Sequence, residues 1–343
     1  MISQIIKKII GYFCYYSGIL HLYAALKSLF GVREVAVLMY HRIVGEEHTG
    51  EPNIVNVKLH RFRSHIEYLS TKYHIISFAE LQALCNQSGS IPKRSVIITF
   101  DDGYEDNYRL AYPILRDNNA TATIALTTGC IGGKEMFWWD KVAHSISNTN
   151  VASISHKNLG TISLQNRERA TRMVQARLKK LRDDVKNQTL LDILKQLQVP
   201  IPEVRNRFLT WEQIVEMSNN NISFAVHTVN HPILTRISFN DAKREIIESR
   251  KEIESKIGRK ITVFAYPNGG AEDMSEEIDD FLIKEGFHFI LTTRYGTNRI
   301  NPNIVFINRI GIEHDDDLVL FKLKLHAFGK LFSSLYEKLK ALA

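Results

Sequence analysis

Short apolar runs that end in polar residues recur along the chain and predict buried β-strands. The clearest run, residues 96–100, is rich in β-branched side chains and ends at Asp101 and Asp102. Other runs end at His41 and at His227, and stretches with helical periodicity separate the runs. Strands that alternate with helices in this way pair in parallel. The expected strands are residues 35–40, 75–77, 96–100, 121–126, 222–226, 261–265, 288–291 and 304–307.

This number of parallel strands is enough to close a barrel. We therefore predict an α/β fold, a distorted (β/α) barrel of about seven to eight parallel strands with a helical insertion and amphipathic terminal helices. Polar residues collect where the strands end, which is the face on which such barrels place their active sites. The pattern therefore favours a functional site at these strand ends.

A polar stretch interrupts the alternation at about residues 140–207. Its centre, residues 167–186, has helical character and carries eight basic residues against three acidic ones. Such a charge run usually forms a solvated helix face, and an anion-binding lid is the alternative. A second inserted helix is expected over residues 187–197. The predicted barrel domain, residues 32–317, contains this insertion.

Amphipathic segments flank the barrel domain at both ends. Residues 1–31 repeat apolar side chains at helical spacing, and no charged residue occurs from Ile9 to Leu26. That span is at the short end for crossing a membrane, so we expect a helix in the membrane interface. The alternatives are a helix packed on the domain and a signal peptide, for which no small-x-small cleavage site is evident. Residues 318–343 predict a C-terminal amphipathic helix, docked on the barrel or touching a membrane.

Composition and charge narrow the class of protein. The chain has 343 residues, 44% of them hydrophobic, which is ordinary for a globular protein. A net charge of +7 suggests an anionic surface or substrate and does not indicate a nucleic-acid binder. The three cysteines are widely spaced and indicate neither a disulfide framework nor a zinc ribbon. We expect a cytoplasmic protein, with peripheral attachment to the inner face of the membrane as an option, and the oligomeric state stays open.

Asp102, His227 and His231 form a candidate metal site. Two imidazoles and one carboxylate suit Zn²⁺ and leave coordination positions open. Pro232 disfavours helical backbone at His231, so the histidine pair is expected on a tight loop. Each part of this candidate site also has a plainer explanation. The Asp-Asp-Gly sequence after the strand can be an ordinary turn, and the two histidines can be a structural pair. Asp101 points in a different direction from its neighbour and is free to handle a proton.

Three motifs carry a resemblance to a known family. They are Thr99-Phe100-Asp101-Asp102-Gly103, His227-Thr228-Val229-Asn230-His231-Pro232 and Tyr266-Pro267-Asn268-Gly269. In this order they resemble the polysaccharide deacetylases, the NodB-homology or carbohydrate esterase family four group. The resemblance runs over about residues 35–312, and residues 38–42 resemble the branch that acts on exopolysaccharide intermediates.

The resemblance implies a role for each residue of these motifs. Asp101 would be the general base, and Asp102, His227 and His231 would bind a divalent metal ion, with Zn²⁺ expected. A backbone N–H beside the Pro-x-Gly turn would bind the oxyanion, which points to Asn268. The other residues implied in substrate binding are Tyr266, in the acetyl pocket, and Pro267.

Two features depart from the family pattern. Many members have an arginine before the Pro-x-Gly segment that orients the base, whereas this chain has Ala265. Arg309, expected just after the last strand, is a candidate for that role or for substrate binding, with a surface salt bridge as the alternative. The family's C-terminal Leu-x-x-His acid is matched by residues 323–326, but within a helical pattern. His41 is therefore the preferred general acid or substrate contact, with a neutral core histidine as the alternative.

The implied function is that of a metal-dependent hydrolase that removes acetyl groups from N-acetylated sugars. The substrate would be a polysaccharide or a lipid-linked glycan intermediate, and membrane contact would fit the latter. An O-acetyl carbohydrate esterase is the alternative with related chemistry. A catalytically silent barrel that binds glycan or organises a membrane complex is the alternative from another class of protein.

Overall fold

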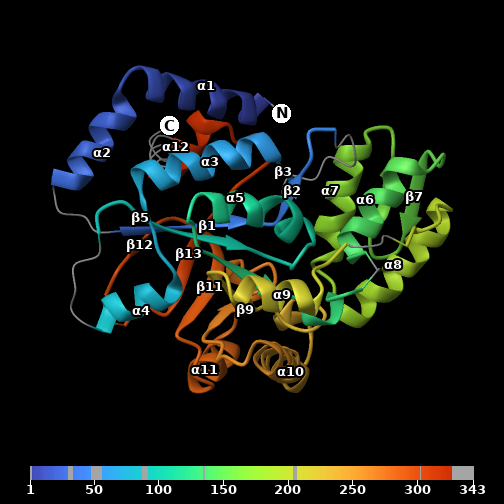
Figure 1. Cartoon of the computed structure of the whole chain (residues 1–343). Coiled ribbons are helices and arrows are strands. Elements are labelled where there is room, and N and C mark those ends of the chain that lie inside the picture. Colours follow the sequence, from blue (N-terminus) through green and yellow to red (C-terminus); the bar gives the residue numbers. More distant parts are fainter. Residues whose placement is uncertain are drawn as a thin grey trace.

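The computed structural model describes residues 2–29, 34–47, 56–86, 92–133, 136–203, 207–301 and 303–326. Within these ranges, parallel strands close into a barrel (Figure 1). Short edge strands extend the sheet beside β5 and beside β1, and they are β4 (His74–Ile75) and β12 (Asn298–Arg299). The barrel predicted from the alternation of strands and helices is confirmed. Around the ring, the strands are β1 (Glu34–Tyr40), β13 (Phe306–Gly311), β11 (Phe289–Tyr295), β10 (Val263–Ala265), β9 (Ile222–Val226), β6 (Ala122–Leu126) and β5 (Ser95–Phe100).

Alternate residues of each barrel strand face two different apolar layers. In β5, Ile97 belongs to the cluster inside the barrel, while Val96 and Ile98 pack against the surrounding helices. Helix α4 (Phe78–Asn86) packs against the interior cluster at the end where the strands begin, with the Phe78 ring 5.2 Å from that of Phe289. The opposite end, where the strands finish, is left for polar side chains.

Helices outside the barrel cover the outer apolar layer (Figure 1). Serine and threonine side chains cap three of them; Thr210 forms a capping box with Gln213, as its sequence position predicts. A small parallel pair, β2 (Arg42–Val44) and β3 (Asn56–Lys58), lies between β1 and the first outer helix. The outer helices are α3 (Leu59–Lys72), α5 (Tyr112–Asp117), α9 (Trp211–Ser218), α10 (Phe239–Ile257) and α11 (Glu276–Lys284).

The insertion forms a small body beside the barrel, with an apolar core of its own (Figure 1). The single helix predicted over residues 167–186 is wrong, because the chain turns at residues 179–182 and a new helix begins at Asp183, where two acidic residues occupy its first turn. A hairpin that the sequence analysis did not predict precedes these helices. The elements are α6 (Trp138–Asn148), β7 (Ser153–His156), β8 (Gly160–Ser163), α7 (Arg167–Leu178) and α8 (Asp183–Leu197).

The N-terminal segment forms two helices instead of one. Helices α1 (Ile2–Tyr16) and α2 (Ile19–Leu29) meet at Gly18, whose φ of +80° suits glycine. Both helices pack on α12 (Leu318–Leu325), the described part of the predicted C-terminal helix; residues 327–343 lie outside the described ranges. In the described part, no single helix is long and apolar enough to span a membrane, although α1 and α2 together have the required length and composition and are bent by 73°.

Candidate active site

The ends of four barrel strands direct polar side chains into the mouth of the barrel. Asp101 continues the inward-facing positions of β5, and His227 follows β9 two residues after the inward-facing Ala225. Arg309 lies within β13, two residues after the inward-facing Ile307, and His41 follows β1. The expectation that polar residues at the strand ends converge is therefore confirmed.

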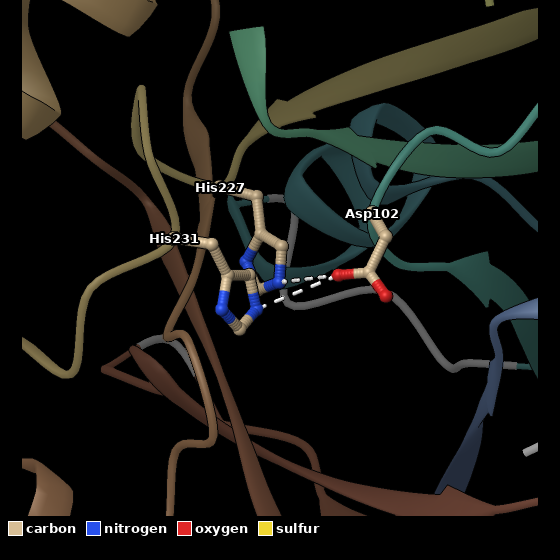
Figure 2. A group of neighbouring side chains, drawn as sticks. All are labelled: Asp102, His227 and His231. Carbon is tan, nitrogen blue, oxygen red and sulfur yellow. Dashed lines mark ion pairs between the residues drawn. The ribbon is translucent and has the colours of Figure 1, made fainter. Parts of the chain in front are cut away.

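Asp102, His227 and His231 meet in one buried cluster (Figure 2). The Nε2 atoms of His227 and His231 each lie 3.5 Å from Oδ1 of Asp102. The two imidazole rings are 4.7 Å apart and nearly perpendicular. The three side chains expose at most 9% of their surface, so the cluster is shielded from bulk water.

A hydrogen bond to the backbone sets the orientation of the His227 ring. Its Nδ1 lies 2.8 Å from the carbonyl oxygen of Ala265. A carbonyl oxygen only accepts, so Nδ1 carries the proton and the lone pair of Nε2 faces Asp102. Ala265 therefore contributes through its backbone, at the position where many family members have an arginine side chain.

Left-handed backbone brings the three side chains together. Asp102, Thr228 and His231 have φ values of +77°, +67° and +56°. These values are strained in residues other than glycine, most of all in a β-branched residue such as Thr228. The Thr228 hydroxyl accepts a hydrogen bond from the backbone N–H of His231 at 3.0 Å and holds the loop tight. The expected tight loop at His231 is therefore confirmed.

The cluster fits a divalent metal ion on its own geometry. Oδ1 of Asp102 is buried and has no hydrogen-bond donor among the described residues. A buried carboxylate oxygen without a partner is unfavourable unless a cation compensates it. Two ligand atoms bound at about 2.1 Å to one tetrahedral ion lie about 3.4 Å apart, close to the 3.5 Å found here for both imidazole–carboxylate pairs.

The charges of the cluster shift the pKa values of Asp102 and His231 in the direction that suits metal ligands. Burial raises the pKa of Asp102, but His227, His231 and His41 together outweigh burial and the net shift is downward, so the carboxylate stays ionised. Burial and the neighbouring His227 lower the pKa of His231 to about 3, so that imidazole is neutral near pH 7. Burial lowers the pKa of His227, yet the two aspartates outweigh it and raise that pKa.

Asp101 is held by a two-pronged ion pair with Arg309. Nη1 and Nη2 of Arg309 donate to Oδ1 and Oδ2 of Asp101 at 2.7 and 2.8 Å, and its Nε donates to the Thr292 carbonyl at 3.0 Å. Both side chains are buried, so the surface salt bridge considered for Arg309 is wrong, and the pairing fits the role of orienting the base. Burial alone would raise the pKa of Asp101, but the guanidinium outweighs it and keeps that pKa well below its usual value.

His41 lies near both aspartates, half-buried at the end of β1. Its Nδ1 is buried and has no hydrogen-bond partner in the described part of the chain. The alternative histidine, His326, ends α12, where its Nε2 lies 3.5 Å from the hydroxyl of Tyr73, and burial lowers its pKa to about 4. His326 lines a cleft beside the residues where β1 and β5 begin, opposite the barrel mouth. Of the two, His41 is therefore the one placed to act as an acid.

His41→Ala is expected to lower kcat by about 10²-fold and to remove the high-pH limb of the kcat profile, since a general acid must be protonated. Steady-state turnover between pH 5 and 10 measures both effects. The exposed His288 at the opposite end of the barrel provides a control, His288→Ala, that should leave the profile unchanged. Full turnover with an unaltered profile in His41→Ala would exclude this role.

Tyr266 does not line the site. Its side chain shares the outward direction of Phe264, packs in the layer between strands and helices, and donates a hydrogen bond from its hydroxyl to Oδ1 of Asp279 at 2.6 Å. The expectation of an acetyl-pocket tyrosine is wrong because side chains alternate along β10. The following turn stays at the mouth: Pro267 is buried, and Asn268 has a φ of +63°.

The insertion adds side chains that the sequence analysis did not assign to the site. The ring of Trp139 lies 4.7 Å from that of His231, and the ring of Phe137 lies 5.6 Å from it. Gln175 ties α7 to this wall through a hydrogen bond of 2.9 Å to the Trp139 carbonyl. Lys179, at the end of α7, is close enough to Asp102 and His231 to influence both charges. Strand alternation could have revealed Arg309, but no local pattern identifies these residues.

Comparisons with known proteins agree with this geometry. A model of the polysaccharide deacetylase family matches residues 88–282. Protein YxkH of Bacillus subtilis (strain 168), provisionally named as a polysaccharide deacetylase, is 23% identical over 280 residues, 81% of this chain and 71% of its own. A poly-β-1,6-N-acetyl-D-glucosamine N-deacetylase of Staphylococcus aureus (strain MSSA476) is 36% identical over 90 residues, 26% of this chain and 30% of its own.

Solved structures share the fold. The deacetylase PplD of Streptococcus pyogenes superposes with a TM-score of 0.58 and 20% identity over 86% of this chain and 99% of its own. IcaB from Ammonifex degensii superposes with a TM-score of 0.55 and 17% identity over 85% of this chain and 97% of its own. The family match spans more than half of the chain, so this chain belongs to the polysaccharide deacetylase family and is a carbohydrate deacetylase.

Proposed function

We propose that this enzyme removes acetyl groups from the N-acetylated sugars of a glycan, using a divalent metal ion held by Asp102, His227 and His231. The observation that carries the proposal is the buried Asp102 oxygen, which faces two imidazole nitrogens and has no hydrogen-bond donor among the described residues. Two imidazoles and a carboxylate are a ligand set that Zn²⁺ prefers, so we propose Zn²⁺ as the resident ion.

A bound ion would polarise the acetyl carbonyl and make a water molecule more acidic. Asp101 is ionised and takes the proton from that water as the water attacks the carbonyl carbon. Its two oxygens accept from Arg309, and each keeps a second lone pair for this proton. Arg309 therefore fixes the direction in which the base points without blocking it.

The remaining steps use groups on the other strand ends. The backbone N–H of Asn268 donates to the oxygen that becomes negative, and that N–H makes no hydrogen bond within the described residues. His41 donates a proton to the departing amine. Trp139 and Phe137 cover one side of His231 and limit the entry of water beyond the one that reacts.

The relatives and the charge of the site support one class of substrate. The named substrate of the Staphylococcus aureus relative is a polymer of an N-acetylated sugar. The charge of Lys179 interacts with Asp273 and with Asp102, and a cation near the site favours a glycan with an anionic group, such as a lipid-linked sugar phosphate. Free thiols at all three cysteines fit action in the cytoplasm, at the inner face of the membrane.

Metal analysis together with acetate release tests the proposal. The purified enzyme should hold near-stoichiometric Zn²⁺, lose acetate release from N-acetylated oligosaccharides after dialysis against a chelator, and regain it with Zn²⁺. His231→Ala should lose the ion, whereas Asp101→Asn should retain it. Activity that survives complete metal removal would overturn the metal site. Release from O-acetylated glycans alone would make the protein an esterase, and no release from any glycan would make it a silent binding barrel.

A further inference from the structure

Most of the large apolar side chains exposed in the described part of the chain lie on α1 and α2. These two helices run along one edge of the molecule (Figure 1). Elsewhere in the described ranges, only Val185, Leu191 and Ile283 are exposed to a comparable degree. Patches of this kind mark interaction surfaces. We call this set the apolar face, and it consists of Ile9, Ile10, Phe13, Tyr16, Ile19, Leu22, Leu26 and Leu29.

The other side of the two helices is anchored to the domain. Cys14 and Leu20 are buried against Leu323 of α12. Lys8 forms an ion pair with Asp315 at 2.5 Å, and the hydroxyl of Tyr12 donates to Asp317. The helices are therefore fixed in rotation, and the apolar face points away from the protein.

A basic cleft of about 1000 Å³ adjoins α2. Four cationic side chains and a single carboxylate line it among the described residues, and that carboxylate, Glu34, is paired with Lys27 at 2.6 Å. Lys93 and Arg94 are exposed at its edge and form no ion pair with any described residue. The cleft thus offers free positive charge next to the apolar face.

We propose that the apolar face docks on a lipid bilayer that contains acidic lipids, with Lys93 and Arg94 contacting the headgroup phosphates. The side chains of the apolar face would lie at the level of the acyl chains, since the segment from Ile9 to Leu26 carries no charged residue. The rings of Phe13 and Tyr16 suit the membrane interface. Cations immediately beside such a face bind the negative surface of an acidic membrane. The inference rests on these surfaces and does not depend on the reaction proposed above.

The charges disfavour the other occupants of this face. A second copy docked through the same face would place two basic clefts at one interface, because a two-fold interface uses the same surface patch of both subunits. Residues 327–343 have a net sequence charge of +2 (Lys330, Lys338 and Lys340 against Glu337), which has the same sign as the cleft and does not complement it. A negatively charged membrane surface complements the cleft.

Vesicle co-sedimentation with the full chain tests the proposal. The wild type should bind vesicles of phosphatidylcholine with phosphatidylglycerol more tightly than vesicles of phosphatidylcholine alone. Phe13→Ser with Leu22→Ser should weaken binding to both at least about tenfold, because both side chains are exposed and would otherwise insert. Lys93→Glu with Arg94→Glu should weaken binding to the acidic vesicles by about tenfold or more and leave phosphatidylcholine binding unchanged.

Matched variants elsewhere on the surface serve as controls. Leu191→Ser with Ile283→Ser removes exposed apolar side chains, and Lys251→Glu with Lys260→Glu reverses exposed charges, and neither should alter binding. All variants should release acetate from a soluble oligosaccharide at the wild-type rate, which separates this test from that of the reaction. Absence of wild-type binding to both vesicles would overturn the proposal. So would sedimentation showing a dimer that Phe13→Ser with Leu22→Ser dissociates, since the face would then join two copies.

Discussion

Asp101→Asn is expected to lower kcat by about 10²- to 10⁴-fold while the metal content stays at the wild-type level. The amide has nearly the same shape as the carboxylate but cannot take a proton from the attacking water. Asp101 belongs to the ion pair with Arg309, while the ligand cluster uses its neighbour Asp102, so the two functions should separate. Acetate release and metal analysis of the same sample measure them.

Asp102→Asn is the matched comparison for this variant. It removes the charge that faces His227 and His231, so we expect it to lose both the ion and the activity. The two variants should therefore differ in metal content, although Asp101 and Asp102 are adjacent and are both buried. If Asp101→Asn loses the ion as well, or keeps more than a tenth of the wild-type kcat, Asp101 is not the base.

Arg309→Met is expected to lower the free energy of unfolding by about 3–5 kcal/mol at pH 7, because it leaves a buried carboxylate without its partner. The same change removes the positive charge that depresses the pKa of Asp101. That pKa should rise toward neutrality, so a larger fraction of the base is protonated and kcat falls. Chemical denaturation and acetate release measure the two effects.

The pH dependence of this variant has a definite sign. In the wild type, the folded-state pKa of Asp101 lies below the unfolded value of about 3.9, so its stabilising effect is present above that value and is lost as the pH falls through the folded-state pKa. In Arg309→Met the pKa is raised, and protonation on acidification relieves the unpaired charge. The stability difference between the two proteins should therefore be largest near pH 7 and shrink toward pH 4. The acid limb of kcat/KM should move to higher pH.

A second buried arginine distinguishes this role from general loss of packing. Arg250 on α10 is also buried and pairs with Glu254 at 3.1 Å, away from the barrel mouth. Arg250→Met should lower stability and leave the pH profile of the remaining activity unchanged. A profile for Arg309→Met that matches that of Arg250→Met would show that Arg309 supports the fold without tuning the base.

Sequence reasoning predicted the barrel and the ligand set for the same physical reason. Buried parallel strands are apolar throughout, so the first polar residues after each run mark the mouth of the barrel. Asp102 and His227 stand at such positions, and Pro232 places His231 on a loop. Convergence then follows from the topology, because neighbouring strands end on the same face.

The wrong predictions concern residues whose place in or outside the site depends on the direction of a side chain or on a contact with a distant part of the chain. The apolar run of the last strand ends at Ile307, yet β13 continues to Gly311 because its polar positions face into the mouth, and Arg309 is one of them. Tyr266 was expected in the site, but alternation along β10 points it outward. The approach of Trp139 to His231 depends on how the insertion packs, which no local pattern encodes.

The partner of the proposed base lies 208 residues downstream of it, on the strand that joins β1 to β11. A nascent chain still lacking β13 cannot complete the ring of strands, and its Asp101 has no counterion. The enzyme therefore becomes competent only when translation has passed residue 309. Truncated products that retain all three ligand residues should remain inactive, so premature release from the ribosome yields no active deacetylase.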